Sequence, residues 1–206
     1  MGAMSTTAAR VPQSERTRAM RQRLLTATVD CLVEHGWSGT STTLVSRRAG
    51  VSRGAQLHHF PTKNDLVLAA VDHLSQTRRD DVLARIARLP QGERRTREVL
   101  DVLADLFTGP LFVAALELWV AARSDETLQP AVAELEAKFG RAAHRHAVEA
   151  LGVDESLPGN RELVQATLDL VRGLGLADVL SDDAARRSGV LDQWAQTLDA
   201  SLRRSA

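Results

Sequence analysis

One short stretch of the chain combines side chains that can read the edges of DNA bases: Ser52-Arg53-Gly54-Ala55-Gln56. Arg53 has the donors to bind guanine through two hydrogen bonds, and Gln56 can do the same with adenine. The small residues Gly54 and Ala55 would let the backbone approach a groove closely, and the methyl group of Ala55 suits that of thymine. The alternatives are a solvated surface charge for Arg53 and a buried side chain for Gln56. The stretch predicts base recognition if it opens an exposed helix.

Two short helices are expected to position this stretch. Ser52 can cap the second of them, because its side-chain oxygen can accept from unpaired backbone N–H groups. The first spans about 42–49 and has Thr40 or Ser41 as its cap. Gly50 supplies the bend between them. Two such helices joined by a tight turn predict a helix-turn-helix, whose second helix enters the major groove.

Phosphate contacts are expected around the same two helices. Lys63 lies at the start of the next helix, where its ammonium and the helix dipole would both attract an anion. Thr42, Thr43 and His58 are further candidates for contacts that position the backbone. The predicted DNA-contact set is Thr42, Thr43, Ser52, Arg53, Gly54, Gln56, His58 and Lys63.

Positive charge is concentrated in the first third of the chain. The whole sequence has 26 Lys or Arg and 26 Asp or Glu, so its net charge is zero. Residues 1–63 contain nine basic residues against three acidic ones, and the remaining residues carry the opposite surplus. A basic end on an acidic body indicates that one end faces phosphate, with chance clustering as the alternative.

The sequence from the first expected helix to the fourth resembles the N-terminal domain of the TetR family of regulators. This resemblance implies an all-α fold, DNA binding as a homodimer and a ligand-sensing second domain. Two departures lie at Gln56-Leu57, where family members usually have an apolar residue and then Tyr, so that Leu57 lacks a hydroxyl that commonly reaches a phosphate. Thr42 and Thr43 also depart from the usual apolar and polar pair. The residues that carry the resemblance are Gly36-Trp37, Thr40, Ala49-Gly50-Val51-Ser52, Gly54, His58-His59-Phe60-Pro61, Lys63 and Asp65-Leu66.

The expected organisation is an arm, a small domain and a larger one. Residues 1–14 predict a disordered arm that begins with a cloning remnant, and 15–61 predict a three-helix helix-turn-helix domain that binds DNA. Residues 62–206 predict a helical domain that binds ligand and dimerises. Since no strand pattern is found, the fold class is all-α, with about nine helices in total. Helices are expected over 15–35, 42–49, 53–59, 63–89, 93–107, 111–124, 127–151, 160–180 and 183–202.

The last two expected helices carry apolar residues suited to a second copy of the chain. Gly173 and Gly175 each cost about 1 kcal/mol relative to Ala inside a helix, which is commonly tolerated where another helix comes close. One small domain reads too few base pairs for selectivity, so a dimer is expected. The resemblance implies a four-helix bundle between two subunits, and an intramolecular core is the alternative. The predicted interface comprises Leu170, Gly173, Leu174, Ala177, Leu191, Trp194 and Leu198.

The segment 111–122 is apolar on every face except at Glu117, and it predicts a central buried helix. A lone carboxylate there needs a partner, which Arg123, Arg172 or a cationic ligand group could supply. The surroundings predict an apolar pocket with one polar anchor, and a packed core with a structural ion pair is the alternative. The predicted lining comprises Leu103, Phe107, Phe112, Leu116, Glu117, Trp119 and Phe139.

Residue pairs that could indicate an enzyme do not converge. His58-His59 and His144 with His146 are one and two positions apart, so on a helix neither pair can hold one metal. No phosphate-binding glycine loop or zinc-protease motif occurs. We expect no enzyme activity, metal or cofactor.

The single cysteine, Cys31, lies in an apolar helical pattern, and neither a signal peptide nor a membrane span of roughly 18 apolar residues is found. These features predict a cytoplasmic protein with no membrane partner. Its predicted function is transcription regulation: a dimer on a palindromic DNA operator, released by a small, largely apolar effector. Repression is the commoner outcome that the resemblance implies. The alternative is an activator, or a regulator without a small-molecule ligand.

Overall fold

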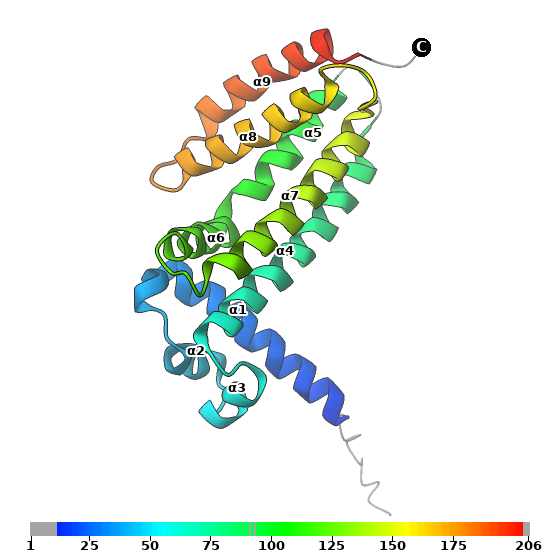
Figure 1. Cartoon of the computed structure of the whole chain (residues 1–206). Helices are drawn as coiled ribbons and strands as arrows, with labels where there is room; N and C mark the ends of the chain where they lie inside the picture. The colour runs from blue at the N-terminus through cyan, green and yellow to red at the C-terminus, as the bar shows by residue number, and fades with distance from the viewer. Residues whose placement is uncertain (1–11, 91, 93, 204–206) are drawn as a thin grey trace, which may run out of the picture.

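The computed structural model describes residues 12–90, 92 and 94–203, and these residues fold into helices without any strand (Figure 1). They form nine α-helices and one short 3-10 helix, as the sequence predicts. Most of the predicted arm, residues 1–11, lies outside the described residues. The arm was predicted to extend to residue 14, but α1 already starts at Gln13.

Three helices form what we call the head: α1 (Gln13–Gly39), α2 (Thr42–Ala49) and α3 (Arg53–His59). Gly36 interrupts α1 with a φ of 64° and a ψ of −176°, so a separate turn follows the long part of the helix. A positive φ of this kind favours glycine, which is why the sequence indicates a helix end at this position.

The remaining helices form what we call the body. Figure 1 shows α4 running from the head along the length of the body, α6 lying between head and body, and α8 and α9 side by side on the far flank. Among the described residues no single helix is long and apolar enough to span a membrane; α5 and α6 pass that test only as a pair, which is bent by 54°. The elements of the body are α4 (Lys63–Arg88), α5 (Arg95–Ala104), η1 (Asp105–Phe107), α6 (Gly109–Ala122), α7 (Gln129–Leu151), α8 (Asn160–Asp178) and α9 (Ala184–Ser201).

The head and the body share part of one hydrophobic core. Leu24, Leu32 and Val45 of the head pack in the same cluster as Leu66 of α4 and Leu118 of α6. The start of α4 and one side of α6 therefore hold the head in place. The prediction that segment 111–122 is buried on all faces is wrong at Val120, which is 60% exposed at the end of α6.

The helix predicted over 93–107 is divided into α5 and η1, and the end of η1 makes a close backbone contact. The α8 backbone crosses η1 at Gly175, where an added Cβ would lie 1.9 Å from the carbonyl oxygen of Phe107. No side chain fits there, so glycine is required; the close contact lies within the subunit, as in the alternative of an intramolecular core, and not with a second copy of the chain. At Gly173 an added Cβ would meet nothing within 4 Å.

Candidate nucleic-acid interface and ligand pocket

Side-chain caps fix the turn between α2 and α3. Ser41 Oγ accepts a hydrogen bond from the Leu44 N–H at 3.2 Å, and Ser52 Oγ accepts from the Ala55 N–H at 3.3 Å. Gly50 ends α2 in the left-handed conformation, with a φ of 62°. Because each helix start is capped from within four residues, this local sequence determines the geometry of the turn.

The start of α3 presents an open polar surface. Ser52, Arg53 and Gly54 are all exposed, and an added Cβ at Gly54 would meet nothing within 4 Å. No ion pair or hydrogen bond holds the Arg53 guanidinium in the part of the chain that the structure describes. Thr43 and His58 are also exposed, and Thr42 is half-buried. The guanidinium of Arg53 is therefore available to a base edge.

Gln56 does not belong to this surface, and its predicted contact with adenine is wrong. Its side chain is fully buried, and its Nε2 donates to the carbonyl oxygen of Phe60 at 2.5 Å. Position 56 faces the core of the head. Of the two interpretations of the sequence, the buried one holds.

Lys63 is likewise turned inward, away from the predicted phosphate contact. Its ammonium donates to the carbonyl oxygen of Trp37 and lies 4.1 Å from the centroid of the Trp37 ring. Burial lowers the pKa of this ammonium below its ordinary value. The cap of α4 is provided instead by Thr62 and Asp65, which form a reciprocal capping box.

Glu117 is bound at the junction of head and body. Its Oε2 accepts from the backbone N–H of Trp37 at 2.7 Å, while an added Cβ on Gly36 would lie only 3.0 Å from that oxygen. The same Trp37 peptide segment accepts from Lys63, so α1, α4 and α6 meet at one residue. The prediction that Glu117 anchors a ligand is therefore wrong: its partner is a backbone N–H, and neither Arg123 nor Arg172 pairs with it.

The body contains two adjoining cavities whose linings share Ser75, Leu106, Leu135 and Phe139. The spaces measure about 520 and 480 Å³, part of each open to solvent. Leu103 lines the larger and Leu116 lines neither, so the predicted role of Leu116 is wrong. The smaller cavity, which we call the aromatic pocket, is lined by Val71, Ser75, Arg78, Leu106, Phe107, Leu111, Phe112, Ala115, Trp119, Leu135, Glu136 and Phe139.

Glu136 is the polar group of the aromatic pocket that the sequence reasoning missed. Its Oε1 accepts from the Trp119 indole N–H at 2.7 Å. Burial raises the pKa of this carboxyl, while the Trp119 hydrogen bond and the charge of Arg172 oppose that rise. Glu136 lies three residues before Phe139, so both side chains lie on one face of α7. This spacing is the feature of the sequence that could have identified Glu136 as a residue of the pocket.

The predicted dimer residues divide between two environments. Leu174, Leu191 and Leu198 are buried inside the subunit, where they pack with Phe107 and neighbouring side chains, so their predicted place in an interface between subunits is wrong. Trp194 is half-buried, and its indole N–H donates to Thr167 Oγ1 at 3.0 Å. The other predicted interface residues, Leu170, Gly173 and Ala177, are at least partly exposed.

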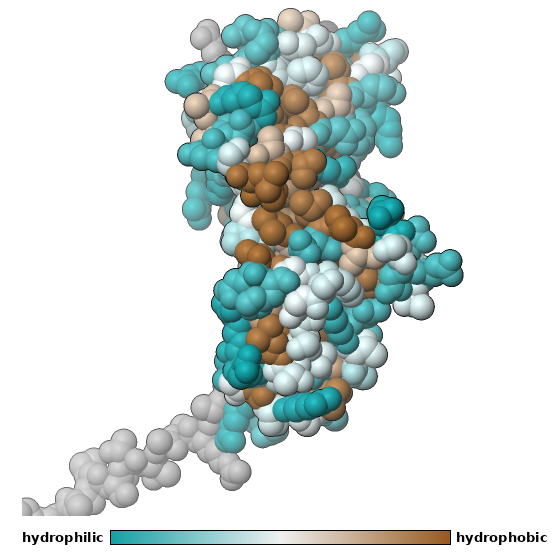
Figure 2. Space-filling model, turned by 90° about the vertical axis from the view of Figure 1, so that its left-hand side faces the viewer, coloured by the Kyte–Doolittle hydropathy of each residue, from teal (hydrophilic) through white to brown (hydrophobic). Residues whose placement is uncertain are grey.

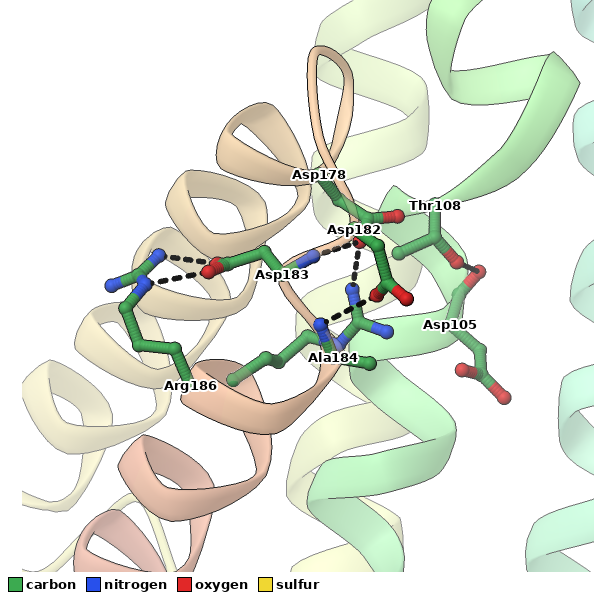
Figure 3. Close-up of polar contacts among 8 residues, drawn as sticks. Asp105, Thr108, Asp178, Asp182, Asp183, Ala184 and Arg186 are labelled. Carbon is green, nitrogen blue, oxygen red and sulfur yellow. Dashed lines mark hydrogen bonds and ion pairs between the residues drawn. The ribbon is translucent and has the colours of Figure 1, made fainter.

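The acidic residues around the turn between α8 and α9 are paired within the protein. Figure 3 shows Asp183 bound to Arg186, and Asp182 accepting from the backbone N–H of Ala184 at 3.0 Å. Asp178 forms an ion pair with Arg187 at 2.8 Å. These pairs close the turn, and no group of three potential metal ligands occurs among the described residues.

This architecture, a helix-turn-helix head on a helical body, is that of a class of DNA-binding regulators, and the comparisons agree. Residues 24–70 match the model of the bacterial regulatory proteins of the TetR family. Over these residues the head is similar to the DNA-binding domain of that family, and the curated relatives that the chain matches are HTH-type transcriptional regulators.

Three similar proteins illustrate the relationship. An HTH-type transcriptional regulator of Mycobacterium tuberculosis is 29% identical over 181 residues, 88% of each chain. CymR of Pseudomonas putida is 37% identical over 120 residues, which are 58% of this chain and 59% of CymR. A transcriptional regulator of Saccharomonospora viridis, solved in complex with choline, shares the fold with a TM-score of 0.68 and 18% identity, over 93% of this chain and all of that one (100%).

Proposed function

We propose that this regulator binds a palindromic DNA operator as a homodimer and acts as a cytoplasmic repressor. The observation that carries the proposal is the exposed, capped start of α3, where Arg53 has no partner among the described residues. Arg53 contacts guanine, and the serine, threonine and histidine side chains around it contact the DNA backbone. The proposed DNA-contact set is Thr42, Thr43, Ser52, Arg53, Gly54 and His58.

The proposed dimer interface is the outward face of α8. Leu176 and Leu180 on this side are 53% and 94% exposed, although both are large and apolar. Figure 2 shows apolar side chains gathered along the middle of one face of the body. Gly173, with open space above it, lets a second helix approach the same face. A pair of subunits joined here spaces its two recognition helices by one DNA turn, roughly 34–36 Å.

The effector is a small, largely apolar molecule bound in the body. Two adjoining spaces lined mainly by apolar side chains support this proposal, as does the fold shared with a regulator that was solved with choline. The cavities are lined in part by α4, whose first turn contacts the head at Trp37. Ligand binding shifts α4, changes the spacing of the recognition helices and releases DNA.

Selection from a random pool of duplex DNA tests the DNA-binding part. The protein should enrich one palindromic sequence whose half-site centres are about 10 base pairs apart. Arg53→Ala should relax the preference at one base of each half-site, while the control Arg47→Ala, an exposed arginine in the last turn of α2, should preserve that base preference. Enrichment of no common sequence would contradict the proposal.

A further inference from the structure

The aromatic pocket collects most of the aromatic side chains of a chain that has few. The sequence contains four Phe, three Trp and no Tyr, and four of these seven rings line this one cavity: Phe107, Phe112, Trp119 and Phe139. They come from η1, α6 and α7, so the fold brings them together from separate elements. The space of about 480 Å³ among these side chains is partly open to solvent, so a ligand must displace side chains to become enclosed there.

The four rings are arranged edge to face. The Phe107 and Phe112 centroids lie 6.0 Å apart at 87°, the Phe107 and Phe139 centroids 6.1 Å apart at 89°, and the Phe112 and Trp119 centroids 6.0 Å apart at 82°. Ring faces carry negative potential and attract cations. The protein already uses one of these faces in this way, since the Arg172 guanidinium lies 5.3 Å from the centroid of Phe107.

Glu136 adds a carboxylate to these rings. Trp119 donates to its Oε1, and its other oxygen, Oε2, has no hydrogen-bond partner in the part of the chain that the structure describes. The Trp119 N–H is neutral, so it satisfies a hydrogen bond but does not cancel the negative charge. A partly buried carboxylate with a neutral partner is stabilised when a cation binds beside it.

The two arginines near the pocket are already engaged. Arg78, which lines the pocket, donates to the carbonyl oxygen of Asp105. Arg172 approaches Asp169 at 3.5 Å and covers the Phe107 ring. Arg78 therefore has its partner outside the cavity, whereas Arg172 covers a ring of the pocket and its charge acts on Glu136; Oε2 of Glu136 is the carboxylate atom that a ligand can still reach.

We propose that the aromatic pocket binds an apolar molecule with one positively charged nitrogen, placed between Glu136 and the aromatic ring faces. The inference rests on the proposed function, because it gives the chemical class of the effector. An amine and a quaternary ammonium share this chemistry. The first binds through a hydrogen bond to Oε2, and the second through charge and ring contacts alone.

Calorimetry with a matched pair of probes tests the inference. Phenyltrimethylammonium and its uncharged carbon isostere, tert-butylbenzene, have the same shape, so their affinities differ through charge. We expect the cation to bind about tenfold more tightly or better. Glu136→Gln keeps an acceptor for the Trp119 indole and should remove most of that preference, leaving tert-butylbenzene unaffected.

The control is Glu134→Gln, which makes the same change of charge on an exposed side chain of α7. It should leave both affinities unchanged. Equal affinity for the two probes, no binding of either at millimolar concentration, or a preference that survives Glu136→Gln would overturn the inference. DNA binding without any ligand is measured separately on the same preparations, so a failure of the DNA-binding proposal is distinguishable from a failure of this one.

Discussion

The head and the body of this regulator obtain their order in different ways. Each helix that shapes the DNA-binding surface, α2, α3 and α4, begins with a side-chain cap, provided by Ser41, Ser52 and Thr62. The helices α5 to α9 begin without one. The geometry of α2, α3 and the start of α4 is therefore set in part by contacts within a few residues, while α1 of the head and the helices α5 to α9 depend on packing between distant helices.

The side chains in the interior of the head also differ from those in the interior of the body. The core of the head is mostly aliphatic, including Leu24, Leu32 and Val45, with the ring of Phe60 beside them. The body holds cavities, a cluster of rings and a partly buried carboxylate at Glu136. The contrast teaches that one chain can combine a region ordered by local caps with a region ordered by packing between distant helices. The two meet at Trp37, which Glu117 and Lys63 both bind.

The largest expected effect comes from the tightest contact of the body. Gly175→Ala places a Cβ 1.9 Å from the Phe107 carbonyl oxygen, so α8 must shift and stability should fall by about 3 kcal/mol or more. The matched control Gly173→Ala should raise the stability of the isolated subunit by up to about 1 kcal/mol through helix propensity. Urea unfolding measures both, and equal stability of the two variants would contradict the close contact. Weaker dimerisation of Gly173→Ala by light scattering would support the proposed interface.

Breaking the junction between the regions should have the next largest effect. Glu117→Ala leaves the Trp37 N–H without its acceptor and should cost about 1–3 kcal/mol. Glu117→Gln keeps an acceptor oxygen and should cost less. Thermal unfolding followed by circular dichroism separates the two variants. If alanine and glutamine behaved alike, the hydrogen bond would not be what holds the junction.

The carboxylate of the aromatic pocket should lower stability at neutral pH, as expected for a binding group. Because burial raises the pKa of Glu136, the folded protein holds the proton more tightly than the unfolded chain does. Stability should therefore fall as pH rises from the ordinary carboxyl pKa through the raised one. Glu136→Gln, which has no proton to lose, should unfold at a higher temperature than the wild type above that window and at a similar one below it. A difference that did not change with pH, or that Glu134→Gln reproduced, would exclude this cause.

The smallest effect is expected in the core of the head. Gln56 Oε1 is buried without a hydrogen-bond partner among the described residues, so Gln56→Leu removes an unpaired atom as well as the bond to Phe60. The two changes oppose each other, and stability should stay within about 1 kcal/mol of the wild type. Base preference on DNA should not change. An altered preference in a selection experiment would restore Gln56 as a base contact.

The same contrast explains which features the sequence predicted. The caps at Ser41 and Ser52 and the bend at Gly50 act on neighbouring residues, so residue type and spacing suffice to find them. The orientation of Gln56 depends on how α3 packs into the head. The partner of Glu117 is a backbone N–H 80 positions earlier in the chain, which no periodicity indicates. At Gly175 the sequence indicated a close approach by a second copy of the chain, whereas the neighbour is the carbonyl of Phe107 in the same subunit, which spacing along the chain does not reveal.

The most direct test of sequence-specific DNA binding by the start of α3 is fluorescence anisotropy across a salt series. The wild type and Arg53→Ala are titrated onto DNA from upstream of the protein's own gene and onto scrambled DNA of the same composition. We expect tight wild-type binding to the upstream DNA that saturates at one or two dimers and survives competition, and Arg53→Ala should lose most of the preference over scrambled DNA. Equal and steeply salt-dependent binding of the wild type to both DNAs would show phosphate attraction alone and would contradict specific recognition at this site.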